Sequence, residues 1–241
     1  MLIDAVDTRT ATERILSWAS RGESRYVCVA NAHTLMEAHD SQAFRSVLAE
    51  ADMVTPDGMP LVWMIRFRGV GEQQRVYGPT LMRMLLELAS ASGLPVAFYG
   101  STSDTLERLV SRLADSMPSL SVVDACSPAF RELTGLEDVA DVERITRSGA
   151  RIVFVGLGCP KQERWMASHR GRIPAVMIGV GAAFDFLAGT KLQASPALQS
   201  LGLEWLFRLA HEPRRLWKRY LVHNPRFAAL ALAELLGLRR S

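Results

Sequence analysis

The segment Arg-Ile-Val-Phe-Val-Gly-Leu-Gly-Cys-Pro-Lys-Gln-Glu-Arg-Trp, residues 151–165, decides the fold of this chain. Its first part, Ile152 to Val155, is β-branched and aromatic, which is typical of a strand buried on both faces. The glycines that follow allow a tight turn, and Pro160 stands where a helix can begin without losing a backbone hydrogen bond. A buried strand, a glycine turn and a helix start predict one unit of an α/β fold.

The same segment carries polar side chains where a ligand would approach the strand. Lys161, Gln162 and Glu163 fill the expected first helical turn, where free N–H groups and the positive end of the helix dipole favour a phosphate. Gly156 and Gly158 allow the backbone to approach a ligand closely. These five residues are therefore a predicted phosphate-binding site.

Strand-like and helix-like segments alternate along most of the chain. The expected strands are Tyr26–Ala30, Met53–Thr55, Val96–Tyr99, Leu120–Val123, Ile152–Val155 and Val176–Val180. The segments between them repeat leucines at helical spacing. This alternation predicts a Rossmann-like fold, a mainly parallel sheet flanked by helices, with ligands beyond the carboxyl ends of the strands.

The pattern changes after Gly189, where strand-like runs end. Three helices are expected over Leu198–Ala210, Pro213–Val222 and Pro225–Leu236, the last two opened by proline. We therefore expect a Rossmann-like catalytic core over residues 1–197 and a helical C-terminal appendage over residues 198–241.

The composition indicates a protein of the reducing cytoplasm. Three cysteines, Cys28, Cys126 and Cys159, are odd in number and lack metal-binding spacing. The first residues show no secretory signal, and no run of about 18 uncharged apolar residues predicts a transmembrane helix.

Positive charge is concentrated in the appendage. Residues 205–241 contain eight Lys and Arg against two Glu, for a net charge of +6, whereas residues 1–204 carry −3. Solvated basic helices would explain this, but an anionic membrane surface is favoured because apolar side chains interleave with the arginines. These side chains are Trp205, Phe207, Leu216, Trp217, Tyr220, Leu221 and Phe227. No nucleic-acid-binding motif accompanies the charge.

Two polar residues follow expected strands, and each has two interpretations. Asn31 could cap the next helix or contact a ligand. Asp57, in Pro56-Asp57-Gly58, could belong to a β-turn or present a carboxylate as a general base. The sequence alone does not choose between them.

Other motifs narrow the chemistry. Arg75 and Gly78 precede the helix Thr80–Leu88 and could bind an anion, although a solvated arginine is equally compatible. Residues 179–185 partly imitate a dinucleotide fingerprint, but Phe184 occupies its third glycine position and disfavours a nicotinamide enzyme. No Asp-x-Asp pair is present to hold a divalent ion against a nucleotide diphosphate.

Taken together, these motifs resemble the WecG/TagA/CpsF family of bacterial glycosyltransferases. The resemblance spans about residues 3–227 and rests on Asn31, Ala51-Asp52, Pro56-Asp57-Gly58, Arg75 with Gly78, Tyr99-Gly100, Gly156 to Glu163, Gly179 to Gly181, Phe184 to Gly189, Gly202 to Arg208 and Glu212 to Arg215. Val29 departs from the family, which often has Thr there.

The resemblance implies inverting, metal-independent transfer of a sugar from a UDP-sugar to a polyprenyl-diphosphate-linked saccharide. It implies no cofactor, and peripheral attachment to the inner face of the cell membrane during synthesis of exopolysaccharide, capsule or teichoic-acid-type polymers. The family's proposed general base falls on Asp57, and its substrate contacts fall on Asn31, Arg75 and Gln162. The motifs also suggest Asp185 and Arg208 as substrate-binding residues.

We hypothesise a single displacement in which a partly desolvated Asp57 accepts the proton of the acceptor hydroxyl. Lys161 and the glycine turn, with Arg214 and Arg215 from the appendage, would stabilise the departing UDP. Two alternatives remain: a noncatalytic scaffold of a polysaccharide assembly, and a nucleotide-dependent oxidoreductase or epimerase. The sugar, the acceptor and any homo-oligomer are not determined by the sequence.

Overall fold

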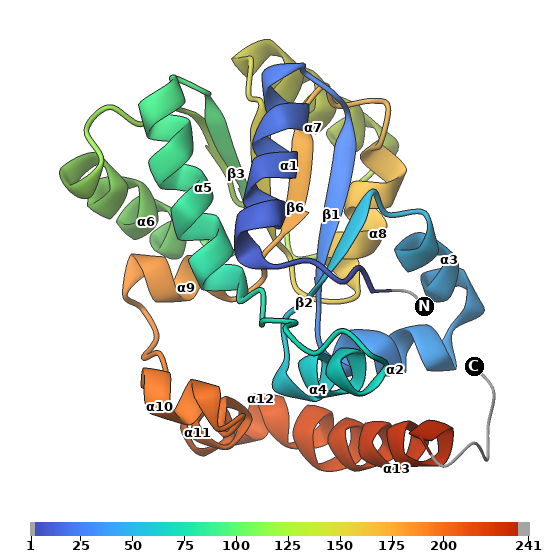
Figure 1. Ribbon diagram of the computed structural model, residues 1–241. Helices are drawn as coiled ribbons and strands as arrows, with labels where there is room; N and C mark the ends of the chain where they lie inside the picture. The colour runs from blue at the N-terminus through green and yellow to red at the C-terminus, as the bar shows by residue number, and fades with distance from the viewer. Residues whose placement is uncertain (1–2, 236–241) are drawn as a thin grey trace.

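The fold is one six-stranded, all-parallel sheet, seen in a computed structural model that describes residues 3–235 (Figure 1). The strands lie in the order β2-β1-β6-β5-β3-β4. Their bounds are β1 Arg25–Ala30, β2 Met53–Pro56, β3 Val96–Gly100, β4 Val122–Cys126, β5 Ile152–Gly156 and β6 Val176–Gly179. The predicted Rossmann-like α/β class is confirmed.

Five strands match their expected ranges to within one residue at either end, whereas β4 begins two residues later than predicted. Leu120 is part of a turn, in which its N–H donates to the Met117 carbonyl at 2.9 Å. β4 is an edge strand and only half-buried, so its apolar pattern marks its position weakly.

Helices cover both faces of the sheet and enclose two hydrophobic cores. One face packs against α1 Thr8–Ser20, α5 Gly78–Ser92, α6 Ser103–Ser116 and α9 Ala183–Ala188. The other face packs against α2 Ala32–Asp40, α3 Gln42–Ala49, α4 Met59–Phe67, α7 Gly135–Ser148 and α8 Lys161–His169. Because the sheet is covered on both sides, its central strands are almost continuously apolar, as in residues 152–155.

All carboxyl ends of the strands meet at one edge of the sheet. From β1 the chain passes to α2 on one face of the sheet, whereas from the neighbouring strand β6 it passes to α9 on the other face. Connections that leave adjacent strands in different directions open a crevice beyond their carboxyl ends.

The C-terminal segment runs along this edge, beside α2 and α4 (Figure 1). It contains α10 Pro196–Ser200, α11 Glu204–His211, α12 Pro213–Lys218, the π-helix η1 Arg219–His223 and α13 Asn224–Leu235. Leu236, Arg239 and Arg240 lie outside the described residues. The domain boundary at residue 198 stays a prediction.

The predicted helix boundaries in this segment were wrong at two points. Gly202 divides the first predicted helix because its φ of +72° breaks the helical path. Pro225, expected to open a helix, is the second residue of α13, which continues directly from η1. A π-turn shifts the hydrogen-bond register, so it accommodates a proline that cannot donate.

The apolar side chains of the segment divide between inside and outside. Leu216 and Tyr220 are buried, and Phe227 packs on the core, so they are not available to a membrane as the sequence had suggested. Trp217 and Leu221 are exposed by 53% and 57%. Within residues 3–235, no helix is both long and apolar enough to cross a membrane.

Candidate active site

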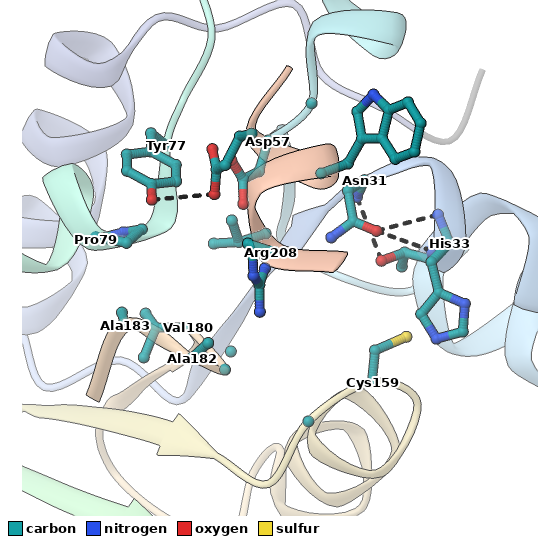
Figure 2. Close-up of a pocket in the computed structure, with 18 of the residues that line it drawn as sticks. Asn31, His33, Asp57, Tyr77, Pro79, Cys159, Val180, Ala182, Ala183 and Arg208 are labelled. Carbon is teal, nitrogen blue, oxygen red and sulfur yellow. Dashed lines mark hydrogen bonds between the residues drawn. The ribbon is translucent and has the colours of Figure 1, made fainter. Parts of the chain in front are cut away.

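A pocket of about 350 Å³ lies beyond the carboxyl ends of β1, β2, β5 and β6 (Figure 2). Its wall includes ten of the predicted site residues: Asn31, Asp57, Arg75, Gly156, Gly158, Gln162, Glu163, Asp185, Arg208 and Arg215. Three other predicted residues, Gly78, Lys161 and Arg214, do not line it. The pocket thus brings together residues separated by more than 180 positions in the chain.

Asp57 follows β2 and is held by backbone and side-chain contacts. Its N–H donates to the Ala30 carbonyl at 2.7 Å, which continues the pairing of β1 with β2. Its side chain is 17% exposed, and Oδ1 accepts from Nε of Arg75 at 3.0 Å and lies 2.9 Å from Nη2. Among the described residues no hydrogen bond reaches Oδ2, so this oxygen can accept a proton from a ligand.

Arg75 joins Asp57 to the C-terminal segment. Its Nη1 lies 2.8 Å from Oε2 of Glu204, the first residue of α11. Tyr77 donates its hydroxyl to Oε1 of Glu204 at 3.2 Å, and its ring lies 4.1 Å from the Arg75 guanidinium carbon. Arg75 therefore bridges two carboxylates that are far apart in the chain, Asp57 and Glu204.

The pKa of Asp57 is raised to about 6, chiefly because burial disfavours the charged form. The negative charge of Glu204 raises it further, whereas Arg75 and Arg208 lower it. Asp57 is therefore mostly ionised at neutral pH, yet it is a stronger base than a solvated aspartate. Burial lowers the pKa of Arg75, but Asp57 and Glu204 raise it by more, so the arginine stays charged.

The glycine turn after β5 is bound to its own helix. The N–H of Gly158 donates to Oε1 of Gln162 at 3.1 Å, and Nε2 of Gln162 donates to Glu163 Oε1 at 2.9 Å. Gln162 and Glu163 are buried, whereas Lys161 is exposed. Gln162 thus fixes the shape of the turn and uses the Gly158 amide that the sequence had suggested for a phosphate.

Asn31 caps α2, which was one of its two interpretations. Its Oδ1 accepts from the N–H groups of His33 and Thr34 at 3.1 and 3.4 Å. The residue also lines the pocket, so the cap fixes a side chain that a ligand can contact.

Gly78 lies behind Asp57, where an added Cβ would be 3.8 Å from Oδ2.

The C-terminal segment supplies the cationic wall of the pocket. Arg208, on α11, has a buried Nε without a hydrogen-bond partner in residues 3–235. Figure 2 shows its side chain between Asp57 and the Val180–Ala182 turn. Arg215 lines the pocket and pairs with Glu212 at 2.6 Å, whereas Arg214 is exposed.

Asp185 joins this wall to the core. Its Oδ2 lies 2.9 Å from Nζ of Lys191, which in turn lies 3.3 Å from Oε2 of Glu212. Asp185 therefore links α9 through Lys191 to the C-terminal helices while it lines the pocket.

Phe184, which stands at the third glycine position of the dinucleotide-like motif in residues 179–185, has a role in packing. The ring of Phe184 lies against β5, where an added Cβ on Gly156 would come within 2.8 Å of its Cδ2. A larger residue than glycine at position 156 would clash with this ring.

Two residues of the pocket or its wall were missed by sequence reasoning. Glu204 stood within the Gly-Leu-Glu-Trp motif but was not assigned a role, and Tyr77 stood between Arg75 and Gly78. The sequence signal that could have identified Glu204 is its acidic side chain at a helix start within an otherwise basic segment.

The fold and the pocket define an α/β protein with a polar cleft at the carboxyl ends of its parallel strands, the place where proteins of this architecture bind ligands. Residues 1–241 match the model described as "Glycosyl transferase WecG/TagA/CpsF family", and the chain belongs to this family. It is therefore a glycosyltransferase, and the prediction of an enzyme is confirmed.

Two relatives with named activities are similar to this chain over most of its length. The chain is 29% identical over 209 residues to the N-acetylglucosaminyldiphosphoundecaprenol N-acetyl-beta-D-mannosaminyltransferase of Bacillus subtilis strain 168, covering 86% of this chain and 79% of the relative. It is 28% identical over 220 residues to the enzyme of the same name from Bacillus spizizenii strain W23, covering 91% and 83%.

Proposed function

We propose that this glycosyltransferase moves a sugar from a UDP-sugar to a saccharide carried on polyprenyl diphosphate, with inversion and without a divalent cation. The relatives' names specify a diphosphoundecaprenol acceptor. The observation that carries the chemistry is Asp57, a carboxylate at the pocket that is only 17% exposed, has a pKa near 6, and has an Oδ2 that accepts no hydrogen bond from residues 3–235.

The reaction proceeds in one displacement. Oδ2 of Asp57 takes the proton of the acceptor hydroxyl while that oxygen bonds to the anomeric carbon. The bond from this carbon to the diphosphate breaks, and UDP leaves with the electron pair. Arg75 holds Oδ1, so it orients the base without occupying the reactive oxygen.

Arg208 and Arg215 stabilise the departing diphosphate in place of a metal ion. Both line the pocket, and their charges are fixed before the reaction begins. The four carboxylates of the pocket already contact other side chains: Asp57 and Glu204 contact Arg75, Glu163 contacts Gln162, and Asp185 contacts Lys191. Because each of these carboxylates already interacts with another side chain, none is needed to hold a divalent cation, which agrees with cation-independent transfer.

The surface beside the C-terminal segment supports peripheral binding to an anionic membrane. Trp217 and Leu221 are exposed there, and α4 adds Trp63 and Phe67, which are exposed by 51% and 70%. α4 is joined to α13 by an ion pair between Arg68 and Glu234. Exposed aromatic groups beside arginines suit the boundary between lipid headgroups and acyl chains.

The test is transfer from a panel of UDP-sugars to a short-chain polyprenyl-diphosphate sugar. We expect one donor to give a β-linked product with chelator present, and Asp57→Asn to lose about 10²-fold or more in kcat while donor binding is kept. A near-normal rate for Asp57→Asn would remove this residue as the base. UDP-sugar cleavage without acceptor would contradict direct transfer.

A further inference from the structure

Two histidines from opposite ends of the chain meet at the edge of the pocket, where His33 is one of the lining residues. His33 is on α2 and His223 ends η1, and their Nδ1 atoms are 3.4 Å apart, with ring centroids separated by 4.9 Å at 70°. Glu37 joins them, with Oε1 3.8 Å from Nδ1 of His33. The potential ligand atoms of these three residues lie within 4.8 Å of one another.

Local structure explains the cluster. His33 and Glu37 are four residues apart on α2 and so share a face. The π-turn η1 places His223 against that face, because α2 packs on both η1 and α13 (Figure 1). Alongside, Arg226 forms two hydrogen bonds to Asp40, at 2.8 and 2.7 Å, which hold α13 at the end of α2.

The spacing of the nitrogens matches a shared metal ion better than a hydrogen bond. Protein N–H donors usually lie about 2.9–3.0 Å from their acceptors. A tetrahedral zinc ion, with bonds of about 2.0–2.1 Å to each nitrogen, would set two histidine nitrogens about 3.3–3.4 Å apart. A small side-chain rotation of Glu37 would bring its oxygen into the same sphere.

We propose that His33, Glu37 and His223 bind one Zn²⁺ ion and thereby fasten the C-terminal segment to α2. Two imidazoles and one carboxylate are a ligand set that zinc prefers, and they leave a fourth position for water or a substrate oxygen. The side chains of His33 and Glu37 are 15% and 30% exposed, so an ion can reach them from solvent. No step at Asp57 passes through this ion.

The experiment measures metal binding directly on the full chain. Protein freed of metal with a chelator is titrated with Zn²⁺ in competition with a chromophoric chelator. We expect one equivalent to bind, and His223→Ala and Glu37→Gln each to weaken affinity by at least about 10-fold. Co²⁺ in place of Zn²⁺ should give the visible absorption of a tetrahedral complex, which His223→Ala loses.

His39→Ala is the matched control, because His39 is on the same helix but exposed and outside the cluster. It should bind Zn²⁺ as the native chain does. If His223→Ala fails to fold, His223→Asn keeps an amide in the same space. Equal affinity in the native and His223 variants, or no bound equivalent in the native chain, overturns the proposal.

Metal binding and sugar transfer are measured separately, so either can fail alone. If the ion only fastens the segment, chelation slows the native enzyme but leaves the rate of His223→Ala unchanged. A chelator that abolishes transfer in both would contradict the metal-independent chemistry and leave the binding result standing.

Discussion

The two walls of the pocket are built differently. The wall from the sheet, with Asn31, Asp57 and Gln162, is fixed by backbone hydrogen bonds and by buried neighbours. The wall from the C-terminal segment, with Glu204, Arg208 and Arg215, is joined to the core through ion pairs of Glu204 and Glu212 and through the buried side chains of Leu216 and Tyr220. The first wall is therefore positioned by the parallel sheet itself, whereas the cationic wall is positioned by contacts between residues far apart in the chain.

Removing the charge of Arg208 from the cationic wall should have the largest effect on kcat. Arg208→Met removes a preorganised charge facing the pocket, so kcat should fall by about 10²-fold with a soluble short-chain acceptor. Arg214→Met, on an exposed neighbour, should stay within about twofold of the native rate. Similar losses in both variants would mean that general charge, not the pocket wall, matters.

The electrostatic effect of Glu204 on Asp57 should be visible in the pH dependence of kcat/KM. The charge of Glu204 raises the pKa of Asp57, so Glu204→Gln should lower that pKa from about 6. In the native enzyme kcat/KM should fall about tenfold per pH unit below 6, because protonated Asp57 cannot act as a base.

In Glu204→Gln that acid limb should move to lower pH, with kcat at neutral pH reduced about 10-fold because a weaker base is less effective. An acid limb that stays in place would mean that the charge of Glu204 does not raise the pKa of Asp57.

Membrane binding by the outer surface of the C-terminal segment can be tested separately. Trp217→Ser should weaken binding to vesicles that contain anionic lipid by about 5-fold, because an exposed ring no longer enters the interface. Leu136→Ser, on α7, removes an 86% exposed apolar side chain far from this segment and should bind as the native protein does. Co-sedimentation with vesicles measures both.

The smallest effect is expected at the turn that directs α11 toward Arg75. Gly202 has φ of +72°, and an added Cβ would lie 3.2 Å from Cη2 of Trp63. Gly202→Ala should therefore lower the free energy of unfolding by about 1 kcal/mol, measured by urea denaturation. Gly135→Ala is the control, because nothing lies within 4 Å of its added Cβ; equal losses would show that Gly202 is not special.

Sequence patterns predicted the sheet well and the C-terminal segment less well. A strand such as 152–155 is buried on both faces, so its residues alone indicate its state. The helices after Gly189 depend on contacts with α2 and α4, and periodicity did not reveal the break at Gly202 or the π-turn before Pro225.

The candidate site was predicted in part for a related reason. Residues at strand ends, such as Asn31 and Asp57, converge by the geometry of any parallel sheet. Glu204 and His223 meet their partners only because the C-terminal segment folds back over that edge, and no local pattern encodes this.

The sequence by itself determined the parallel sheet, the family motifs and the position of Asp57 after β2, because each follows from short-range hydrophobic patterning and turn chemistry. Only the tertiary structure decided the pairing of Arg75 with both Asp57 and Glu204, the raised pKa of Asp57, and which arginines face the pocket. These properties depend on distances and burial between groups far apart in the chain, which chain order does not specify.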